Sequence, residues 1–321
     1  MVYYENVGKA KETPFHALPE GGNEQAGASS QAVIQVSGLA KRFGLVRALD
    51  GVDLVVQPGQ VYGFLGPNGA GKTTTIRCLL GFIRPNQGDV QLFGQPAWQV
   101  EAGIRNRIGY LSSDALFYNS WSPAQHINFA QSVRRTESIA LELAERFNLD
   151  MNTKFRKLSS GNKQKLGLVL ALMHKPDLLI LDEPTRGLDP LLQRELYAVL
   201  REVKARGGTV FMSSHNLSEV EQVCDEVGII RQGKMVASDT LQSLRKMQTH
   251  VIKIVTGDEL RLDEFNQLPN VEVVGHNSHE LTAKVDGDFN AFMKLATKYT
   301  LHDIDISHAS LEEVFLRYYD A

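Results

Sequence analysis

Continuous apolar runs of strand length predict the central strands of this chain. A strand that is apolar at every position is typical of a parallel sheet covered on both faces. Such runs occupy residues 61–65, 178–181 and 209–212. Two further short runs rich in valine and isoleucine predict strands at 33–36 and 52–56, and a hairpin that turns at Gln232-Gly233 is expected over 227–236.

Apolar residues spaced by three and four positions predict helices between these strands. A helix over 73–81 follows the first buried strand, and helical periodicity runs through much of 120–175. A later helix is predicted from one apolar stripe, which consists of Leu217, Val220, Cys224 and Val227. Alternating strands and helices predict an α/β fold with a mostly parallel sheet.

The two ends of the chain have a different texture. Residues 1–30 combine prolines, glycines and scattered charge without an apolar period, and we expect a flexible leader there. Beyond about Thr240 the pattern predicts a small separate α+β domain. Its expected strands lie at 251–255 and 281–285, and its expected helices at 289–297 and 311–319.

Composition narrows the class of protein. The apolar fraction of 43% and the charged fraction of 22% are close to the averages of globular proteins. The net charge is −3, so that no overall positive potential favours nucleic acid as a partner. Cys78 and Cys224 lack metal-ligand spacing and are predicted to be reduced, buried thiols. No apolar run approaches the roughly 20 residues of a membrane-spanning helix, so any membrane part must come from another polypeptide.

A phosphate-binding loop follows the strand at 61–65 and opens a helix. It has the spacing Gly-x-x-x-x-Gly-Lys-Thr, and its residues are Gly66, Pro67, Asn68, Gly69, Ala70, Gly71, Lys72 and Thr73, with Thr74 next. Glycines allow backbone N–H groups to face phosphate oxygens, at a helix N-terminus with positive potential. Lys72 is expected to reach the β- and γ-phosphates, and the Thr73 hydroxyl to bind Mg²⁺. This loop alone fits a kinase, a GTPase or an ATPase.

Two acids and a histidine stand at strand ends. Asp182 follows a buried strand, at the edge of the sheet where ligands bind, and is predicted to hold Mg²⁺ directly or through water. Glu183 is the expected base that activates water. His215 ends another strand and is expected to contact the γ-phosphate and to hold the water or Glu183.

An ordered set of motifs resembles the nucleotide-binding subunits of ATP-binding-cassette (ABC) transporters. Leu158-Ser159-Ser160-Gly161-Asn162 precedes Leu178 to Pro184, and Gly187-Leu188-Asp189 follows. The resemblance covers about residues 31–238 and implies a P-loop ATPase with a mostly parallel core sheet, an antiparallel β subdomain and a helical subdomain at about 115–175. It implies ATP and Mg²⁺ as cofactors, and a stacking contact between Phe43 and adenine.

The resemblance also implies a dimer. Ser159 and Gly161 belong to the family's signature motif and would face the γ-phosphate of ATP held by a second copy. Asp189 would belong to the segment that contacts this nucleotide across the interface. Two ATP molecules would therefore lie in a head-to-tail homodimer.

Three departures from the family pattern alter these expectations. Ser160 and Asn162 replace the more usual residues of the signature motif. Ser113 stands where a glutamine is common, so that Ser113 or Asp114 would have to take over its contact with Mg²⁺. Arg186 replaces a small residue and could alter the dimer contact.

The ending of the chain, residues 310–319, resembles the extension of ATPases that serve ABC-2-type exporters, a group that includes bacitracin-resistance-like pumps. This implies an integral membrane permease as partner, no nucleic-acid partner, and a cytoplasmic protein that is peripheral on the inner face of the cell membrane. Phe117, Tyr118 and Trp121 are expected either to form an interface for the permease or to belong to the core of the helical subdomain.

Two other classes of function compete with this interpretation. A soluble ABC protein of ribosomes or DNA repair would carry two cassettes or a long coiled coil, and neither pattern occurs here. A P-loop kinase would have no role for residues 158–162 or 187–189. The sequence therefore predicts the ATPase subunit of an ABC exporter, and leaves the transported substrate open.

Overall fold

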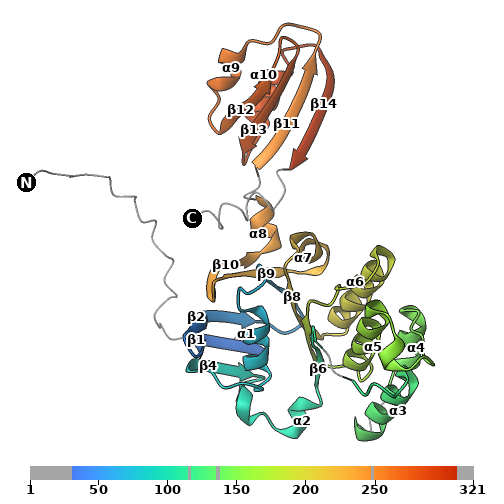
Figure 1. Ribbon diagram of the computed structural model, residues 1–321. Coiled ribbons are helices and arrows are strands. Elements are labelled where there is room, and N and C mark those ends of the chain that lie inside the picture. The colour runs from blue at the N-terminus through green and yellow to red at the C-terminus, as the bar shows by residue number, and fades with distance from the viewer. Residues whose placement is uncertain (1–30, 115–116, 135–137, 247–248, 309–321) are drawn as a thin grey trace, which may run out of the picture. The chain divides into compact units, whose positions relative to one another are not determined.

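The computed structural model describes residues 31–114, 117–134, 138–246 and 249–308 (Figure 1). The leader expected at 1–30 and the helix expected at 311–319 lie outside the described residues. Within the described ranges, no helix combines the length and the apolar character needed to span a bilayer.

The central sheet has the order β10-β9-β3-β8-β7-β6. Its strands are β3 (Val61–Leu65), β6 (Ile108–Leu111), β7 (Leu178–Asp182), β8 (Thr209–Ser214), β9 (Glu226–Arg231) and β10 (Lys234–Thr240). All neighbouring pairs are parallel except β9 and β10, which form an antiparallel hairpin. The mostly parallel sheet predicted from the sequence is therefore confirmed.

Successive residues of β7 enter two different apolar cores, because side chains of a strand alternate between faces. Leu178 and Ile180 join the core on the side of α1 (Lys72–Leu79), whereas Leu179 and Leu181 join the core on the side of α5 (Ser160–Leu172) (Figure 1). The strand is apolar throughout because both of its faces are covered.

A second, antiparallel sheet has the order β2-β1-β4-β5 and shares its core with α1. Its strands are β1 (Ile34–Phe43), β2 (Val46–Val56), β4 (Gln87–Leu92) and β5 (Gln95–Pro96). The short elements η1 (Ala97–Gln99) and α2 (Ala102–Arg105) connect it to β6.

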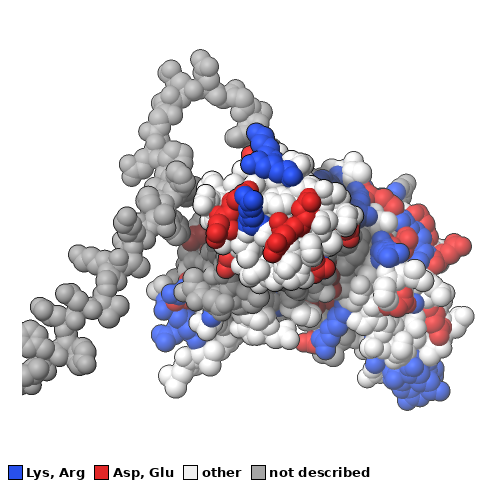
Figure 2. All heavy atoms as spheres, turned by 90° about the horizontal axis from the view of Figure 1, so that it is seen from above, with Lys and Arg blue, Asp and Glu red and all other residues white. Residues whose placement is uncertain are grey.

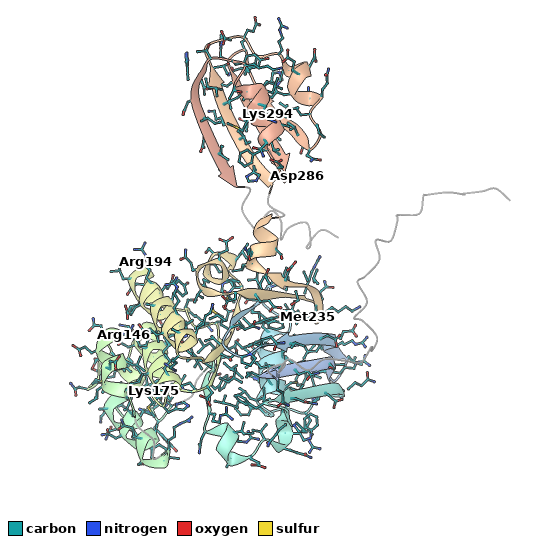
Figure 3. All side chains as sticks on the ribbon, turned by 180° about the vertical axis from the view of Figure 1, so that it is seen from behind. Arg146, Lys175, Arg194, Met235, Asp286 and Lys294 are labelled. Carbon is teal, nitrogen blue, oxygen red and sulfur yellow. The ribbon has the colours of Figure 1, made fainter. Side chains whose placement is uncertain are left out.

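The helical part consists of α3 (Pro123–Arg134), α4 (Ala140–Arg146), η2 (Phe155–Lys157) and α5. It packs through Ile127, Leu143 and Phe147 into the same core as α6 (Pro190–Ala205). Arg146 on α4, labelled in Figure 3, forms ion pairs with two acids of α6, Glu195 at 2.7 Å and Glu202 at 2.8 Å. These pairs fix α4 against a helix that is distant in sequence.

Residues 249–308 form a third sheet with its own core and the order β12-β13-β11-β14. Its strands are β11 (Thr249–Thr256), β12 (Val271–His276), β13 (Glu280–Asp286) and β14 (Leu301–His308), and its helices are α9 (Leu262–Asn266) and α10 (Asn290–Ala296). Ile252 and Ile254 of β11 are fully buried with Phe265 and Phe292 of the two helices. In the view of Figure 2, acidic and basic side chains are interspersed among the described residues.

One predicted helix is shorter than expected. The stripe from Leu217 to Val227 predicted a single helix, but α7 (Leu217–Val223) ends before Cys224, and Val227 lies in β9. Cys224 takes an extended backbone with ψ of 154°, which leads the chain directly into the strand. Leu241 at the start of α8 (Leu241–Lys246) packs in the core of α5 and α6, beyond the predicted domain limit at 238.

Candidate functional site

The phosphate loop connects β3 to α1 and has a backbone that favours glycine. Gly71 has φ of 115°, and a Cβ at Gly66 would stand 2.3 Å from the carbonyl oxygen of Ile230. Lys72 is 6% exposed, and its Nζ donates to the carbonyl oxygen of Gly66 at 2.7 Å and to that of Pro67 at 3.3 Å. The lysine therefore lies within the curl of its own loop.

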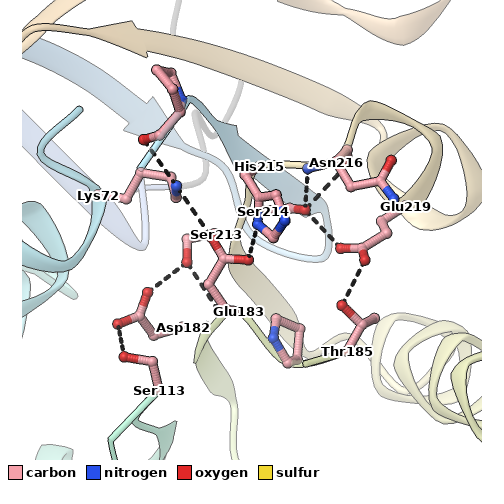
Figure 4. A network of polar contacts seen from close by, with 12 residues as sticks. Lys72, Ser113, Asp182, Glu183, Thr185, Ser213, Ser214, His215, Asn216 and Glu219 are labelled. Carbon is pink, nitrogen blue, oxygen red and sulfur yellow. Dashed lines mark hydrogen bonds and ion pairs between the residues drawn. The ribbon is translucent and has the colours of Figure 1, made fainter. Parts of the chain in front are cut away.

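Asp182 stands at the end of β7 and accepts hydrogen bonds from hydroxyl groups of three segments, and Figure 4 shows two of these contacts, with Ser113 and Ser213. Its Oδ2 accepts from Thr73 Oγ1 at 2.8 Å and from Ser113 Oγ at 3.0 Å, and its Oδ1 accepts from Ser213 Oγ at 2.7 Å. Asp182 is fully buried. Hydroxyl and carboxylate oxygens are the donors that Mg²⁺ prefers, so this set fits that ion.

Glu183 has a left-handed backbone, with φ of 51°. Its Oε2 lies 2.7 Å from Nδ1 of His215, and its Oε1 lies 3.1 Å from Nζ of Lys72 in an ion pair. Its backbone N–H donates to Ser213 Oγ at 3.1 Å, the same hydroxyl that donates to Asp182. The predicted base, the predicted histidine and the loop lysine are thus in direct contact (Figure 4).

A cavity of about 540 Å³ lies over the phosphate loop. Its lining comprises Val46, Arg47, Ala48, Pro67, Asn68, Gly69, Gly71, Lys72, Thr73, Thr74, Ser113, Glu183, Arg186 and Gln232. Most of the phosphate-loop residues predicted from the sequence are among them. Val46, Arg47 and Gln232 were not predicted as site residues, because β2 carries no recognisable motif and Gln232 was predicted only as part of the hairpin turn.

Ser113 and Asp114, the two alternatives for the missing glutamine, have different environments. Ser113 contacts Asp182 and lines the cavity, whereas Asp114 has a 77% exposed side chain and pairs with Arg186 at 3.9 Å. Burial raises the pKa of nearby Tyr110, against an opposing hydrogen bond from Ser112. Of the two, Ser113 is the residue that this geometry brings to the candidate metal site.

Ser159, Gly161 and Asp189 do not line the cavity of their own chain. Ser159 is the N-cap of α5 and accepts a hydrogen bond from the N–H of Asn162 at 3.2 Å. Asp189 caps α6 by accepting from the N–H groups of Leu191 and Leu192. A Cβ at Gly161 would stand 2.8 Å from the carbonyl oxygen of Gly187, so the signature and Asp189 segments touch.

Phe43 ends β1 and is 49% exposed, with Lys41 Nζ 5.3 Å from its ring centre. It is absent from the cavity lining, although Val46, three residues further on, is present. The aromatic cluster of Phe117, Tyr118 and Trp121 surrounds His126 of α3. Phe117 packs against the core, whereas Tyr118 is 61% exposed, so the cluster includes both core and surface positions.

Two further residues, which hydrogen-bond to the segments of the site, were not predicted from the sequence. Ser213 joins Asp182 to Glu183, and Glu219 on α7 accepts hydrogen bonds from Thr185 and Ser214. The available signal was a pair of serines at the end of an apolar strand, and an acid on the buried side of a helix. Neither pattern is specific without a structure.

A phosphate loop between the parallel strand β3 and a helix, with two acids at the end of β7, which β8 separates from β3 in the same sheet, defines a P-loop nucleoside triphosphatase. Comparison with known proteins narrows this class. Residues 49–186 match the family model described as ABC transporter. The chain is 34% identical over 301 residues to the bacitracin transport ATP-binding protein BcrA of Bacillus licheniformis, covering 89% of this chain and 96% of the relative.

A second relative is the daunorubicin/doxorubicin resistance ATP-binding protein DrrA of Streptomyces peucetius, which is 32% identical and matches 88% of this chain and 91% of its own length. Among solved structures, an ATP-binding subunit of an ABC transporter matches 66% of this chain and 92% of its own, with a TM-score of 0.61 and 29% identity. A dimeric bacterial ABC transporter cassette shares the fold, with a TM-score of 0.60 and 20% identity.

The chain therefore belongs to the ATP-binding proteins of ABC transporters. It is an ATPase subunit of such a transporter, as the sequence predicted, and its relatives include ATP-binding proteins of drug resistance and antibiotic transport.

Proposed function

We propose that this chain hydrolyses ATP at a head-to-tail homodimer interface and thereby drives export through a separate ABC-2-type permease. The observation that supports this most is the contact of Glu183 with both Lys72 and His215 beside the cavity. The names of BcrA and DrrA, which refer to transport and resistance, favour export as the direction. The proposed location is the cytoplasmic side of the cell membrane, on the permease.

The phosphate loop would bind the triphosphate. The loop beyond Pro67 would supply N–H groups at the N-terminus of α1, and Lys72 would exchange its contacts with Gly66, Pro67 and Glu183 for phosphate oxygens. Phe43 would stack on adenine from the end of β1. Arg47 and Gln232 line the cavity beyond the loop and would contact the rest of the nucleotide.

Thr73 and Asp182 would hold Mg²⁺, with Ser113 as a further oxygen donor, because their three side chains already meet at one carboxylate oxygen. This ion would supply charge neutralisation at the β- and γ-phosphates. Glu183 would orient and deprotonate the attacking water, and His215 would fix the Glu183 carboxylate through the 2.7 Å contact.

A second copy would complete each site. Ser159 and Gly161 lie at the N-terminus of α5 outside the cavity of their own chain, and would face the γ-phosphate held by the partner copy. Asp189, which caps α6, would shape the adjoining segment. The domain plan that we propose is a leader at 1–30, a cassette from 31 to about 238 and an accessory domain at 239–321.

Replacing Glu183 by glutamine tests this proposal. The variant should bind ATP, because the phosphate loop is intact, and should lose turnover by about a thousandfold, because the amide cannot accept the proton of water. It should also accumulate as an ATP-bound dimer in sedimentation velocity. Normal turnover by the glutamine variant would contradict the assignment of Glu183 as the base. A nucleotide-bound variant that stays monomeric would contradict the shared site.

A further inference from the structure

Glu219 is a buried acid next to the catalytic strand ends. It lies on α7 and is 8% exposed. Its Oε1 accepts from Thr185 Oγ1 and its Oε2 accepts from Ser214 Oγ, both at 2.6 Å (Figure 4). These are short hydrogen bonds, as expected for hydroxyl groups that donate to a carboxylate.

Among the described residues, its hydrogen-bond partners are hydroxyl groups and not a lysine or arginine. A carboxylate that leaves water needs hydrogen bonds to offset its desolvation, so both hydroxyls are committed as donors to Glu219. Loss of either donor would leave a buried oxygen unsatisfied, which costs more than the hydrogen bond itself contributes. The geometry of this triad is therefore tightly specified.

The Thr185 contact fixes the turn that follows Glu183. Thr185 is two residues after Glu183, and its carbonyl oxygen accepts from the N–H of Leu188 at 3.0 Å. The carbonyl oxygen of Glu183 accepts from the N–H of Arg186 at 3.3 Å. The left-handed backbone at Glu183 therefore leads directly into a turn that Glu219 holds through the Thr185 side chain.

The Ser214 contact fixes the other catalytic segment. Ser214 precedes His215, and its carbonyl oxygen accepts from the N–H of Gly66, the first glycine of the phosphate loop, at 3.1 Å. Its hydroxyl also accepts from the N–H of Asn216 at 2.9 Å. The Glu219 carboxylate thus connects the turn after Glu183 with Ser214. Ser214 precedes His215 in the chain and is hydrogen-bonded to the phosphate loop.

We infer that Glu219 is a positioning residue of the ATPase, which holds the segments of Glu183 and His215 in register through the hydroxyls of Thr185 and Ser214. The inference rests on the roles proposed for Glu183 and His215. Because Glu219 contacts neither the cavity nor the phosphate loop directly, it acts on the chemical step and not on ATP binding.

The test compares steady-state ATPase activity of full-length variants well below their melting temperatures. Glu219→Gln replaces one acceptor oxygen by an N–H₂ donor, so that one hydroxyl must reverse its hydrogen bond. Its kcat should fall roughly ten- to a hundredfold, as small displacements of reacting groups do, while KM for ATP stays within about threefold. Thr185→Val, which keeps the shape and removes the hydroxyl, should have the same effect.

Two matched variants separate positioning from general destabilisation. Thr185→Ser keeps the hydroxyl and should retain kcat within about twofold. Thr209→Val removes a buried hydroxyl from the opposite end of β8, where it accepts from the N–H of Gly59 at 3.0 Å. It should lower the melting temperature as Thr185→Val does, with kcat unchanged. The Thr185 pair also keeps the inference testable if Glu219→Gln does not fold.

The inference is overturned if Thr185→Val retains normal kcat, if Thr185→Ser loses as much kcat as Thr185→Val, or if Thr209→Val loses as much as either. A rise of KM without a fall in kcat would overturn it as well. Glu183→Gln, assayed in parallel, distinguishes the two proposals. Normal turnover in that variant contradicts the role of Glu183, whatever the Thr185 pair shows.

Discussion

At the scale of single residues, one oxygen of Asp182 brings together two hydroxyls that are distant in sequence. Thr73 donates to Oδ2 from the start of α1, and Ser113 donates to the same atom from the segment after β6. The family pattern favours a longer side chain at position 113, yet the serine reaches the aspartate at 3.0 Å. The hydrogen bond from position 113 to Asp182 therefore forms with a side chain as short as serine.

Replacing Ser113 by alanine should weaken the response to Mg²⁺. The Mg²⁺ concentration for half-maximal ATPase activity should rise by about tenfold, the effect typical of losing a group that supports a metal ligand. A magnesium titration of activity at saturating ATP measures it. Ser112→Ala is the matched control, because Ser112 accepts from the N–H of Asp114 and makes no contact with Asp182. Equal shifts in the two variants would contradict the role of Ser113.

The residues of this site were predictable where a motif states the chemistry. Lys72, Thr73, Asp182, Glu183 and His215 were expected to converge, and the structure brings them together. Ser213 and Glu219 were not predictable, because hydrogen bonds between side chains and segments that are distant in sequence leave no periodic trace in the sequence. Their importance is apparent only from distances.

At the scale of elements, His174 joins the end of α5 to β6. Its Nε2 lies 3.2 Å from the carbonyl oxygen of Ile108, whereas its Nδ1 is buried and has no hydrogen-bond partner in the described part of the chain. Burial, the largest cause, and the positive charge of Arg134 together lower the pKa of His174 from 6.5 to about 4. The folded protein therefore keeps this histidine neutral.

Stability of the cassette should fall as the pH drops from about 6.5 towards about 4. The unfolded chain binds the proton first, because its pKa of 6.5 is the higher one, so protonation favours unfolding. Between pH 7 and pH 5 this single group should cost about 2 kcal/mol, a loss that His174→Gln should not show. Urea unfolding followed by the fluorescence of Trp98 and Trp121 measures it. Equal losses in both proteins would contradict the prediction.

Elements were predictable from the sequence where burial was two-sided. The wholly apolar strands β3, β7 and β8 appear where expected, because both faces are covered. β12 and β14 were not predicted, since many of their residues are exposed and polar. The end of α7 was misplaced because Cys224 and Val227 continue the spacing of a helical stripe. Cys224 follows the helix and Val227 lies in β9, and both are buried in the same core.

At the scale of the whole molecule, the residues proposed for one ATP site lie in two separate places on a single chain. Lys72, Thr73 and Glu183 line the cavity, whereas Ser159 begins a helix whose N-terminus lies outside it. The sequence alone could not derive a dimer from this separation, because spacing along a chain does not report which copy supplies a residue. The dimer was predicted only from the family resemblance, and it remains a proposal for this chain.

An arginine at Ser159 should separate ATP binding from dimer formation. In the Glu183→Gln background, Ser159→Arg places a bulky cation at the start of α5, where the partner's γ-phosphate would dock, and leaves the cavity of the same chain intact. The monomer should bind ATP within about threefold of the parent, because the altered site lies elsewhere, while the ATP-dependent dimer disappears from sedimentation velocity. Ser132→Arg, at an exposed position on α3, controls for the added charge and should dimerise normally.

A dimer that survives Ser159→Arg would exclude Ser159 from the interface. Loss of ATP binding by the monomer would instead mean that Ser159 serves the nucleotide of its own chain.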